Sequence, residues 1–211
     1  MTDERLVVAV IDDDLSIREA LQGLLETVAL KAELFGSVEE YLRASKSRPA
    51  NCIVLDVRLP GASGLDFQAQ LASANSRTPI VFITAHADIP MSVRAIKAGA
   101  IEFLTKPYRD QELLDAVRKG IEHDRSRRAE IQALTDLQAR FASLTPRERE
   151  IMSLLTDGRM TKQIAGQIGI SDMTVRIHRT QVMSKMGARS IADLVRMADK
   201  LDLKSSKVLP N

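Results

Sequence analysis

Four short apolar segments, each closely followed by charged or hydroxyl-bearing residues, constrain the fold of this chain more than any other feature. The segments are Leu6–Ile11, Cys52–Leu55, Ile80–Ile83 and Ile101–Leu104, and the polar residues that follow them are Asp12 and Asp13, Asp56, Thr84 and Lys106. In an open parallel sheet, the side chains just past the carboxyl ends of the strands converge on one crevice. The pattern therefore predicts that residues spread over almost a hundred positions meet at one site.

Strands and helices alternate through the first 120 residues. A further strand, Lys31–Phe35, brings the number of expected strands to five, and Pro79–Ile83 is apolar throughout, as in strands that are buried on both faces. Helices are expected at Ser16–Thr27, Val38–Ala44, Leu65–Leu71 and Met91–Ala98, with a last helix that Asp110 can cap. Five such units imply a doubly wound α/β fold, with a five-stranded parallel sheet, right-handed crossovers and helices on both faces.

The segment from about Arg118 to Arg140 is rich in charged residues and has no proline. It is interpreted either as a disordered linker or as a helix that extends the last helix of the first domain. We favour the helix because good helix formers dominate, and because Ile131, Leu134 and Leu137 recur at helical spacing. A stripe that narrow needs a partner, from the other domain or from another subunit.

The rest of the chain is helical by pattern. Thr145-Pro146, Ser171 and Ser190 are typical helix starts, and Gly158, Gly169 and Gly187 are typical helix ends. A helix at 161–168, a tight turn and a helix at 171–186 make a helix-turn-helix. We therefore expect domains at 1–120 and 143–211, joined by a helical linker at 121–142.

Composition and charge indicate two different tasks. The chain is 45% hydrophobic and 27% charged, and it contains no apolar run near 18 residues and no signal peptide, so we expect a cytoplasmic protein without a membrane contact. Its single cysteine, Cys52, excludes a disulfide framework and is interpreted as a small buried hydrophobe. Residues 143–211 carry a net charge of +5 and residues 1–142 a net charge of −3. The basic part is the candidate for nucleic acid.

The predicted site combines residues that suit metal and phosphate chemistry. Hard oxygen ligands of the kind that Mg²⁺ takes together with water are offered by the carboxylates of Asp12, Asp13 and Asp56 and by the backbone carbonyl of Arg58. A carboxylate can also attack phosphorus and form an aspartyl-phosphate, whose oxygens Lys106 and Thr84 would contact. Each residue alone would be an ordinary solvated residue at a strand end, but all five together favour a site.

The motifs around these residues resemble the receiver domain of two-component response regulators over about residues 5–120. They are Val10-Ile11-Asp12-Asp13-Asp14, Leu55-Asp56-Val57-Arg58-Leu59-Pro60-Gly61 with Gly64, Ile83-Thr84-Ala85 and Leu104-Thr105-Lys106-Pro107. The stretch from Ile83 to Met91 resembles the FixJ-like subgroup in particular. The resemblance implies the strand order 2-1-3-4-5, with Asp56 as phosphoacceptor, Asp12 and Asp13 as Mg²⁺ acids, Thr84 and Lys106 as phosphate contacts, and Phe103 as the aromatic switch.

The helix that begins after Ser171 has an inner and an outer stripe. Val175, Val182 and Met186 can pack inward, and the outer stripe, at i, i+3, i+4, i+7 and i+11, consists of Met173, Arg176, Ile177, Thr180 and Ser184. Base edges can be read by Arg176, Ile177 and Thr180. Phosphates can be held from the periphery by Lys162, Thr174, Arg179 and Lys185. The competing interpretation is a solvated polar helix face.

The same region is similar to the LuxR-type DNA-binding domain over residues 143–203. The matching motifs are Leu144-Thr145-Pro146-Arg147-Glu148-Arg149-Glu150, Lys162-Gln163-Ile164-Ala165, Ile170-Ser171, Thr174-Val175-Arg176-Ile177-His178 and Lys185-Met186. The two resemblances imply a response regulator rather than an enzyme, phosphorylated on Asp56 by a sensor histidine kinase. They also imply a homodimer on phosphorylation and binding to double-stranded promoter DNA, with RNA polymerase as a candidate partner.

Two other classes of protein remain as alternatives. An aspartyl-nucleophile phosphatase or dehalogenase would carry its Asp-x-Asp pair after the first strand, whereas here the candidate nucleophile, Asp56, follows the third. A DNA-binding protein with a degenerate receiver would act without phosphorylation, and the intact five-residue site argues against it. A phosphotransfer assay distinguishes all three classes.

Overall fold

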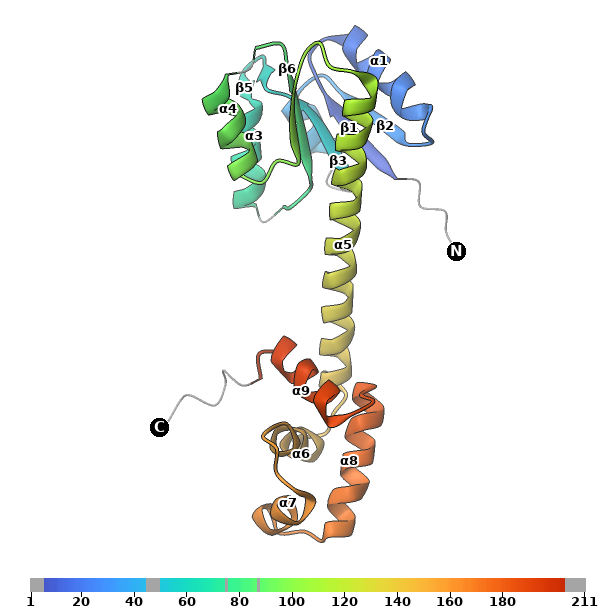
Figure 1. The fold of residues 1–211 in the computed structure, drawn as a ribbon, viewed down its shortest axis with the longest axis vertical. Helices are drawn as coiled ribbons and strands as arrows, with labels where there is room; N and C mark the ends of the chain where they lie inside the picture. Colours follow the sequence, from blue (N-terminus) through green and yellow to red (C-terminus); the bar gives the residue numbers. More distant parts are fainter. Residues whose placement is uncertain (1–5, 45–49, 75, 87, 204–211) are drawn as a thin grey trace. The chain divides into compact units, whose positions relative to one another are not determined.

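The computed structural model describes residues 6–44, 50–74, 76–86 and 88–203. Contacts divide the chain into two units, Met1–Arg128 (unit 1) and Ala129–Asn211 (unit 2). Unit 1 contains the strands of the described residues, and unit 2 is helical (Figure 1).

The sheet of unit 1 has five parallel strands, as predicted. They are β1 (Val7–Ile11), β2 (Lys31–Phe35), β3 (Cys52–Asp56), β6 (Ile80–Thr84) and β7 (Glu102–Thr105). Their spatial order is β2-β1-β3-β6-β7, which is the predicted 2-1-3-4-5 topology. Every residue of β1, β3 and β6 is buried, because helices cover both faces of the sheet.

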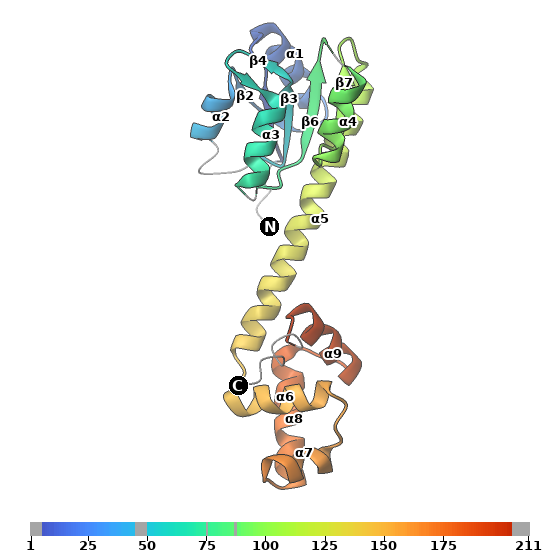
Figure 2. The ribbon, with the colours of Figure 1, turned by 90° about the vertical axis from the view of Figure 1, so that its left-hand side faces the viewer.

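Helices on the two faces of the sheet enclose two hydrophobic cores. They are α1 (Leu15–Glu26), α2 (Val38–Ala44), α3 (Gly64–Ser73), α4 (Ile89–Lys97) and α5 (Asp110–Ala142). The first core lies between the sheet and α2, α3 and α4 (Figure 2), and the second lies between the sheet and α1 and α5. Alternate residues of each strand enter opposite cores: Ala9 and Ile11 of β1 belong to the first, and Val8 and Val10 to the second.

Two details of unit 1 differ from the sequence-based expectation. A small antiparallel hairpin, β4 (Arg58–Leu59) and β5 (Ala62–Ser63), follows β3 and was not predicted, because two-residue strands leave no periodic pattern. The last helix of unit 1 begins at Asp110 itself rather than after it. Its start is instead supported by Glu112, whose side chain accepts a hydrogen bond from the backbone N–H of Arg109 at 3.1 Å.

The helix α5 runs without interruption over 33 residues, so the predicted linker segment is helical and not irregular. Part of its apolar stripe is buried and part is exposed. Leu137 is buried in the core of unit 2 and Phe141 packs against that core, whereas Ile131 and Leu134 remain exposed. The domain ends expected at 120 and 143 remain predictions.

A buried carboxylate fastens α5 to the sheet of unit 1 near the start of the strands. Asp124 is completely buried, and its oxygens accept hydrogen bonds from Asn51 at 3.1 Å, from Arg127 at 2.6 Å and from Arg128. The amide oxygen of Asn51 in turn accepts a hydrogen bond from the backbone N–H of Val7 at 2.9 Å. A buried charge requires partners of this kind, and here they join α5 to Asn51, directly before β3, and through Asn51 to Val7 at the start of β1.

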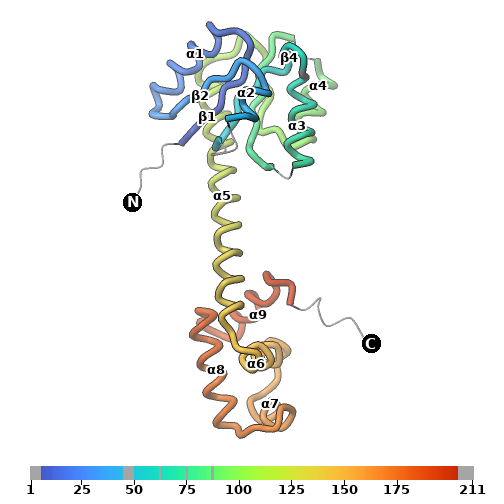
Figure 3. Tube along the Cα trace, turned by 180° about the vertical axis from the view of Figure 1, so that it is seen from behind, coloured from blue at the N-terminus to red at the C-terminus, as the bar shows by residue number. Residues whose placement is uncertain are grey.

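Unit 2 folds around a core of its own. Besides the end of α5 it contains α6 (Pro146–Thr156), α7 (Thr161–Ile168), α8 (Asp172–Met186) and α9 (Ile191–Lys200), which Figure 3 traces from behind. The predicted N-caps are confirmed, since the side chains of Thr145, Ser171 and Ser190 accept hydrogen bonds from backbone N–H groups of the first turns. The predicted helix ends at Gly169 and Gly187 are also confirmed, and both glycines have a left-handed backbone conformation.

We predict that Gly120 is needed for the contact between α5 and the sheet. A Cβ at this position would lie 2.7 Å from Sγ of Cys52, a fully buried residue of β3. Overpacking lowers the free energy of unfolding by about 1–3 kcal/mol. The higher helix propensity of Ala relative to Gly raises it by about 1 kcal/mol. Gly120→Ala should therefore lower the free energy of unfolding in the wild type, but should be neutral or stabilising in a Cys52→Ala background.

Tyrosine fluorescence during urea unfolding measures this double-mutant cycle, because Tyr41 and Tyr108 both lie in unit 1 and the chain has no tryptophan. An equal effect of Gly120→Ala in both backgrounds would show that the contact with Cys52 is not what requires glycine.

Candidate functional site

The carboxyl ends of β1, β3 and β6 bring three predicted site residues together with Lys106. Asp12 follows β1, Asp56 ends β3 and Thr84 ends β6, and all three are buried. Lys106 comes directly after β7, where its backbone N–H donates to the carbonyl of Thr84 at 2.7 Å, and the Lys106–Pro107 peptide bond is cis. The predicted convergence at this edge of the sheet is therefore observed for Asp12, Asp56 and Lys106.

The ammonium of Lys106 bridges the two buried carboxylates. Nζ lies 2.8 Å from Oδ2 of Asp12 and 2.8 Å from Oδ2 of Asp56. The other oxygen of each carboxylate accepts a backbone N–H at 2.9 Å, from Asp14 in the case of Asp12 and from Arg58 in the case of Asp56. Both acids are thus fixed by a backbone amide on one side and share one cation on the other.

Burial and charge act against each other in this cluster. Burial raises the pKa of the Asp12 carboxyl above its usual value, and the hydrogen bond from Lys106 offsets this only in part. For Lys106, burial lowers the pKa, but the hydrogen bonds to Asp12 and Asp56 outweigh it, so the pKa of the ammonium is raised. The site therefore holds a charged lysine beside an Asp12 carboxylate whose negative charge is costly to bury.

The remaining predicted residues, Asp13, Thr84 and Phe103, have different surroundings. Asp13 is exposed. The hydroxyl of Thr84 accepts a hydrogen bond from the backbone N–H of His86 at 3.3 Å, within the loop after β6. Phe103 on β7 is half-buried, and its ring centre lies 6.0 Å from that of Phe82 in the first core.

The donor set at this edge fits Mg²⁺, although it is not arranged as a group of three acids. Among the described residues, no three His, Cys, Asp or Glu side chains lie close enough to hold a metal ion. Mg²⁺ commonly uses only one or two carboxylates and completes its shell with water. Asp12 and Asp56 meet that requirement with hard oxygen ligands.

Gly64, which follows the β4–β5 hairpin, lies close to the end of β3. Gly64, the first residue of α3, donates its N–H to the carbonyl of Val57 at 2.9 Å. A Cβ at Gly64 would lie 2.6 Å from the backbone carbonyl of Asp56. Glycine is therefore required here for α3 to approach the end of β3 so closely.

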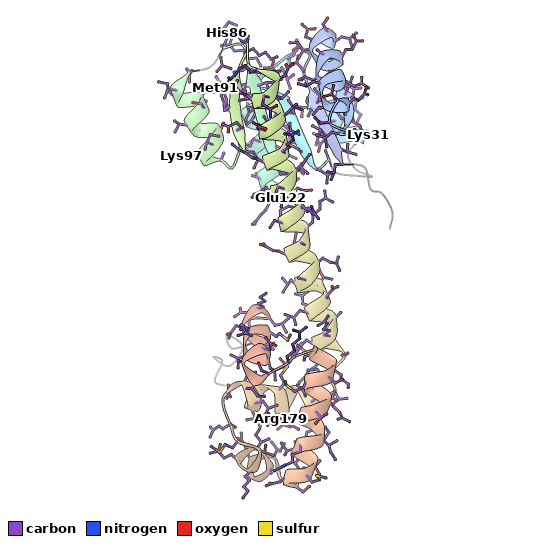
Figure 4. The ribbon with its side chains drawn as sticks, turned by 45° about the vertical axis from the view of Figure 1, so that its right-hand side comes forward. Lys31, His86, Met91, Lys97, Glu122 and Arg179 are labelled. Carbon is purple, nitrogen blue, oxygen red and sulfur yellow. The ribbon has the colours of Figure 1, made fainter. Side chains whose placement is uncertain are left out.

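The face formed by α4 carries exposed apolar residues together with charges. Ile89, Val93 and Ile96 are exposed large hydrophobic residues on α4. Figure 4 shows Met91 and Lys97 on this helix and His86 in the loop before it. Lys97 is exposed, whereas Met91 packs partly against the first core.

In unit 2, α7 and α8 form the predicted helix-turn-helix. The inner stripe of α8 is confirmed, since Val175, Val182 and Met186 are fully buried. The outer stripe is exposed, and 67% of Met173 and 50% of Ile177 are accessible. Arg176, Arg179 and Thr180 are exposed as well, and Figure 4 shows Arg179 on α8. An exposed surface of this composition can meet bases and phosphates.

The candidate phosphate contacts at the periphery differ in their exposure and in their side-chain partners. Lys162 on α7 is exposed, and no side-chain partner is recorded for it among the described residues. Thr174 is half-buried, with its hydroxyl 2.8 Å from that of Ser171. His178 is half-buried. Its Nδ1 is buried and has no hydrogen-bond partner in the part of the chain described.

The structure gives Lys185 a partner inside the protein, which the sequence did not indicate. Its Nζ lies 2.7 Å from Oε2 of Glu148, a residue of α6 that is 3% exposed. The same oxygen accepts the backbone N–H of Thr145 at 2.7 Å. The hydrogen bonds from Lys185 and Thr145 hold the pKa of the Glu148 carboxyl below its usual value. Glu148 looks like an ordinary capping-box acid in the sequence, so nothing local predicts its burial.

Comparisons with known proteins agree with both halves of this architecture. Residues 8–118 match the response regulator receiver domain family, and residues 142–198 match the LuxR family of bacterial regulatory proteins. The chain is 48% identical to Nodulation protein W of Bradyrhizobium diazoefficiens over 202 residues, covering 96% of this chain and 89% of that protein. It is 39% identical to the transcriptional regulatory protein FixJ of Azorhizobium caulinodans, covering 92% of each.

This chain is a two-component response regulator with a LuxR-type DNA-binding domain. Among solved structures, the regulator is similar to the response regulator StyR, with a TM-score of 0.84 and 45% identity over 93% of this chain and 99% of that one. It is also similar to full-length FixJ from B. japonicum, with a TM-score of 0.57 and 36% identity over 93% and 97%. No helix in the described part of the regulator is long and apolar enough to cross a membrane.

We predict that the Glu148–Lys185 pair stabilises unit 2 in a pH-dependent way. Because the folded-state pKa of Glu148 is lowered from 4.5, its stabilisation is present above about pH 4.5 and is lost as the pH falls through the folded-state pKa. Glu148→Gln should therefore lower the stability of unit 2 near pH 7, and the difference from the wild type should shrink at acidic pH.

Urea unfolding followed by the methyl NMR signals of Met152 and Met186, both buried in unit 2, measures this difference. Glu150→Gln is the matched control, because Glu150 is an exposed acid on the same helix. A difference between Glu148→Gln and wild type that stays constant with pH would contradict the assignment.

Proposed function

We propose that the regulator is phosphorylated on Asp56 by a sensor histidine kinase and then binds promoter DNA through α8. The observation that carries the first step is the Lys106 ammonium, which is held 2.8 Å from the carboxylates of both Asp12 and Asp56. A cation fixed beside a buried carboxylate is suited to stabilise the charge of an incoming phosphoryl group. The family assignment supports the same reaction.

In the proposed transfer, an oxygen of Asp56 attacks the phosphorus of a phosphohistidine. The new O–P bond forms as the P–N bond breaks, and the electron pair leaves with the histidine nitrogen, which takes up a proton. The product is an acyl phosphate on Asp56. Lys106 would pair with one phosphoryl oxygen, and the hydroxyl of Thr84 would donate to another after giving up its hydrogen bond to the carbonyl of His86. The regulator thus accepts the group rather than turning over a substrate, and we do not class it as an enzyme.

Mg²⁺ is the cofactor proposed for this step. Asp12, Asp13, Asp56 and the backbone carbonyl of Arg58 would hold it, and it would supply positive charge to neutralise the phosphoryl oxygens. Two of these acids already converge on Lys106, and Asp13 is the exposed neighbour of one of them.

The proposed consequence of phosphorylation is dimerisation through the α4 face. Movement of Thr84 toward the phosphoryl group would leave room for Phe103, which lies on the strand beside β6. The candidate interface combines exposed Ile89, Val93 and Ile96 with Arg94 and Lys97. On the adjoining strand, Glu102 lies 3.6 Å from Lys119, so it would have to exchange partners. Mixed apolar and charged surfaces of this kind can pair symmetrically.

A dimer would read DNA with one α8 from each subunit. Arg176, Ile177 and Thr180 are proposed to contact base edges in the major groove of two half-sites related by a dyad. Lys162, Thr174 and Arg179 are proposed to contact phosphates, while Lys185 would do so only by sharing its ammonium with Glu148. RNA polymerase at the promoter is a further proposed partner. Because promoter DNA lies in the cytoplasm of a bacterium, we propose that the regulator acts there.

We predict that phosphorylation is confined to Asp56. Incubation with acetyl phosphate and Mg²⁺ should add one acid-stable, base-labile phosphoryl group, detected by intact mass and peptide mapping. Asp56→Asn should abolish the mass shift, and Asp13→Asn should raise the Mg²⁺ concentration that is required. The control Asp66→Asn removes an exposed acid on α3 and should have no effect. A phosphopeptide that lacks Asp56 would refute the assignment.

We predict that Arg176 determines sequence preference and that Lys162 does not. Arg176→Ala should cost about 1–3 kcal/mol on the preferred DNA and relax selectivity at one or two base pairs. Lys162→Ala should weaken preferred and scrambled DNA alike and reduce the salt slope by about one. Fluorescence anisotropy over a salt series measures both effects. Equal weakening of the two DNAs by Arg176→Ala would mean that Arg176 is a phosphate contact.

A further inference from the structure

The recognition helix α8 is held at the end opposite to its exposed reading residues. Its last residue, Met186, is fully buried. The carbonyl of Met186 accepts a hydrogen bond from Nη1 of Arg140 at 3.2 Å, and the preceding residue, Lys185, pairs with buried Glu148. Two contacts from outside the helix, one from α5 and one from α6, therefore fix its final turn.

The guanidinium of Arg140 completes the C-terminal cap of α8. The carbonyls of the last turn of a helix lack partners within the helix and carry partial negative charge. The N–H of Gly187 bonds to the carbonyl of Ser184 at 3.1 Å, and the N–H of Ala188 bonds to that of Met183 at 3.0 Å. Arg140 supplies a donor and a positive charge to the carbonyl of Met186. A Cβ on Gly187 would lie 2.8 Å from Nη1 of Arg140, so the guanidinium packs directly on the turn.

Arg140 belongs to a part of α5 that is built into the core of unit 2. Leu137 is buried in that core and Phe141 packs against it. The guanidinium of Arg149 on α6 lies 5.2 Å from the ring centre of Phe141 and donates to the carbonyl of Ala142 at 2.9 Å. Arg140 nevertheless lies before residues 142–198, the range that matches the LuxR family.

Holding this end of α8 matters because the reading residues are far from it. Ten residues separate Arg176 from Met186, which is about 15 Å along a helix. A tilt of about 10° at the end that is held would displace Arg176 by roughly 2–3 Å at this rise per residue. Hydrogen bonds to bases require heavy-atom distances within a few tenths of an ångström, so such a tilt would abolish them.

We propose that Arg140 is a positioning residue for DNA reading, which fixes α8 in the orientation that presents Arg176, Ile177 and Thr180 to bases. The DNA-reading unit of this chain then includes the last turns of α5. This inference rests on the proposed reading role of α8.

The test uses the full chain and two duplexes: one selected from a random pool by the wild-type protein, and a scrambled one. Arg140→Met removes the guanidinium and keeps an unbranched apolar stem, and Arg140→Lys restores a donor and a charge. Arg125→Met is the matched control, since Arg125 is an exposed arginine of α5 within unit 1. Amide exchange at Gly187 and Ala188 without DNA shows whether the last turn of α8 has loosened and whether unit 2 remains folded.

We expect Arg140→Met to speed exchange at these two amides and to weaken the selected duplex about tenfold, the order of one good base contact. The scrambled duplex should change less than about threefold, and the salt slope should stay unchanged, because no phosphate contact is lost. Arg140→Lys should recover most of the affinity, and Arg125→Met should match the wild type.

Several results would overturn the proposal. Equal weakening of both duplexes with a smaller salt slope would make Arg140 a phosphate contact. Faster exchange with an unchanged preference for the selected duplex, or no change in either measurement, would show that Arg140 does not position α8 for reading. Arg176→Ala, measured in parallel, distinguishes a failure of this inference from a failure of the proposed base reading. If Arg176→Ala relaxes the preference and Arg140→Met does not, only this inference fails. If Arg176→Ala leaves it intact, the proposed base contact of Arg176 fails too.

Discussion

The ion-paired cluster of Lys106 with Asp12 and Asp56 is the interaction on which the receiver unit depends. It joins the ends of β1, β3 and the segment after β7, and its members are separated by up to 94 positions in the sequence. Two buried carboxylates at one edge of a sheet would repel each other without a cation. The ammonium resolves that conflict, but it also leaves the site responsive to any group that changes the local charge. A phosphoryl group on Asp56 would be such a group, and so would Mg²⁺.

The helix α5 contains residues of both units. Its first turns pack on the sheet, with Gly120 against Cys52, and buried Asp124 fastens it to Asn51. Its last turns supply Leu137 to the core of unit 2 and Arg140 to the end of α8. One helix therefore contributes structural residues to both units. Burial also raises the pKa of Cys52 to about 12, so this thiol serves packing rather than redox chemistry.

Sequence patterns were sufficient where structure depends on local chemistry or simple periodicity. The five strands, the caps at Thr145 and Ser171 and the buried stripe of α8 follow from apolar runs and capping residues, whereas the strand order was implied by the resemblance to receiver domains. The β4–β5 hairpin was missed because two-residue strands have no period. The roles of Lys185, Asp124 and Arg140 were missed for another reason. Each is a charged residue on a helix that looks solvated in the sequence, and its partner comes from a distant segment that only the fold brings near.

In the proposed function, the phosphorylation state of Asp56 controls DNA binding by α8. The most direct measurement is the affinity of the full chain for a selected duplex with two half-sites, before and after acetyl phosphate and Mg²⁺, with phosphate occupancy of Asp56 verified in the same sample. We expect tighter binding by the phosphorylated wild type, as a dimer, and no change for Asp56→Asn. Equal affinity of the phosphorylated and unphosphorylated wild type, at full occupancy of Asp56, would contradict it.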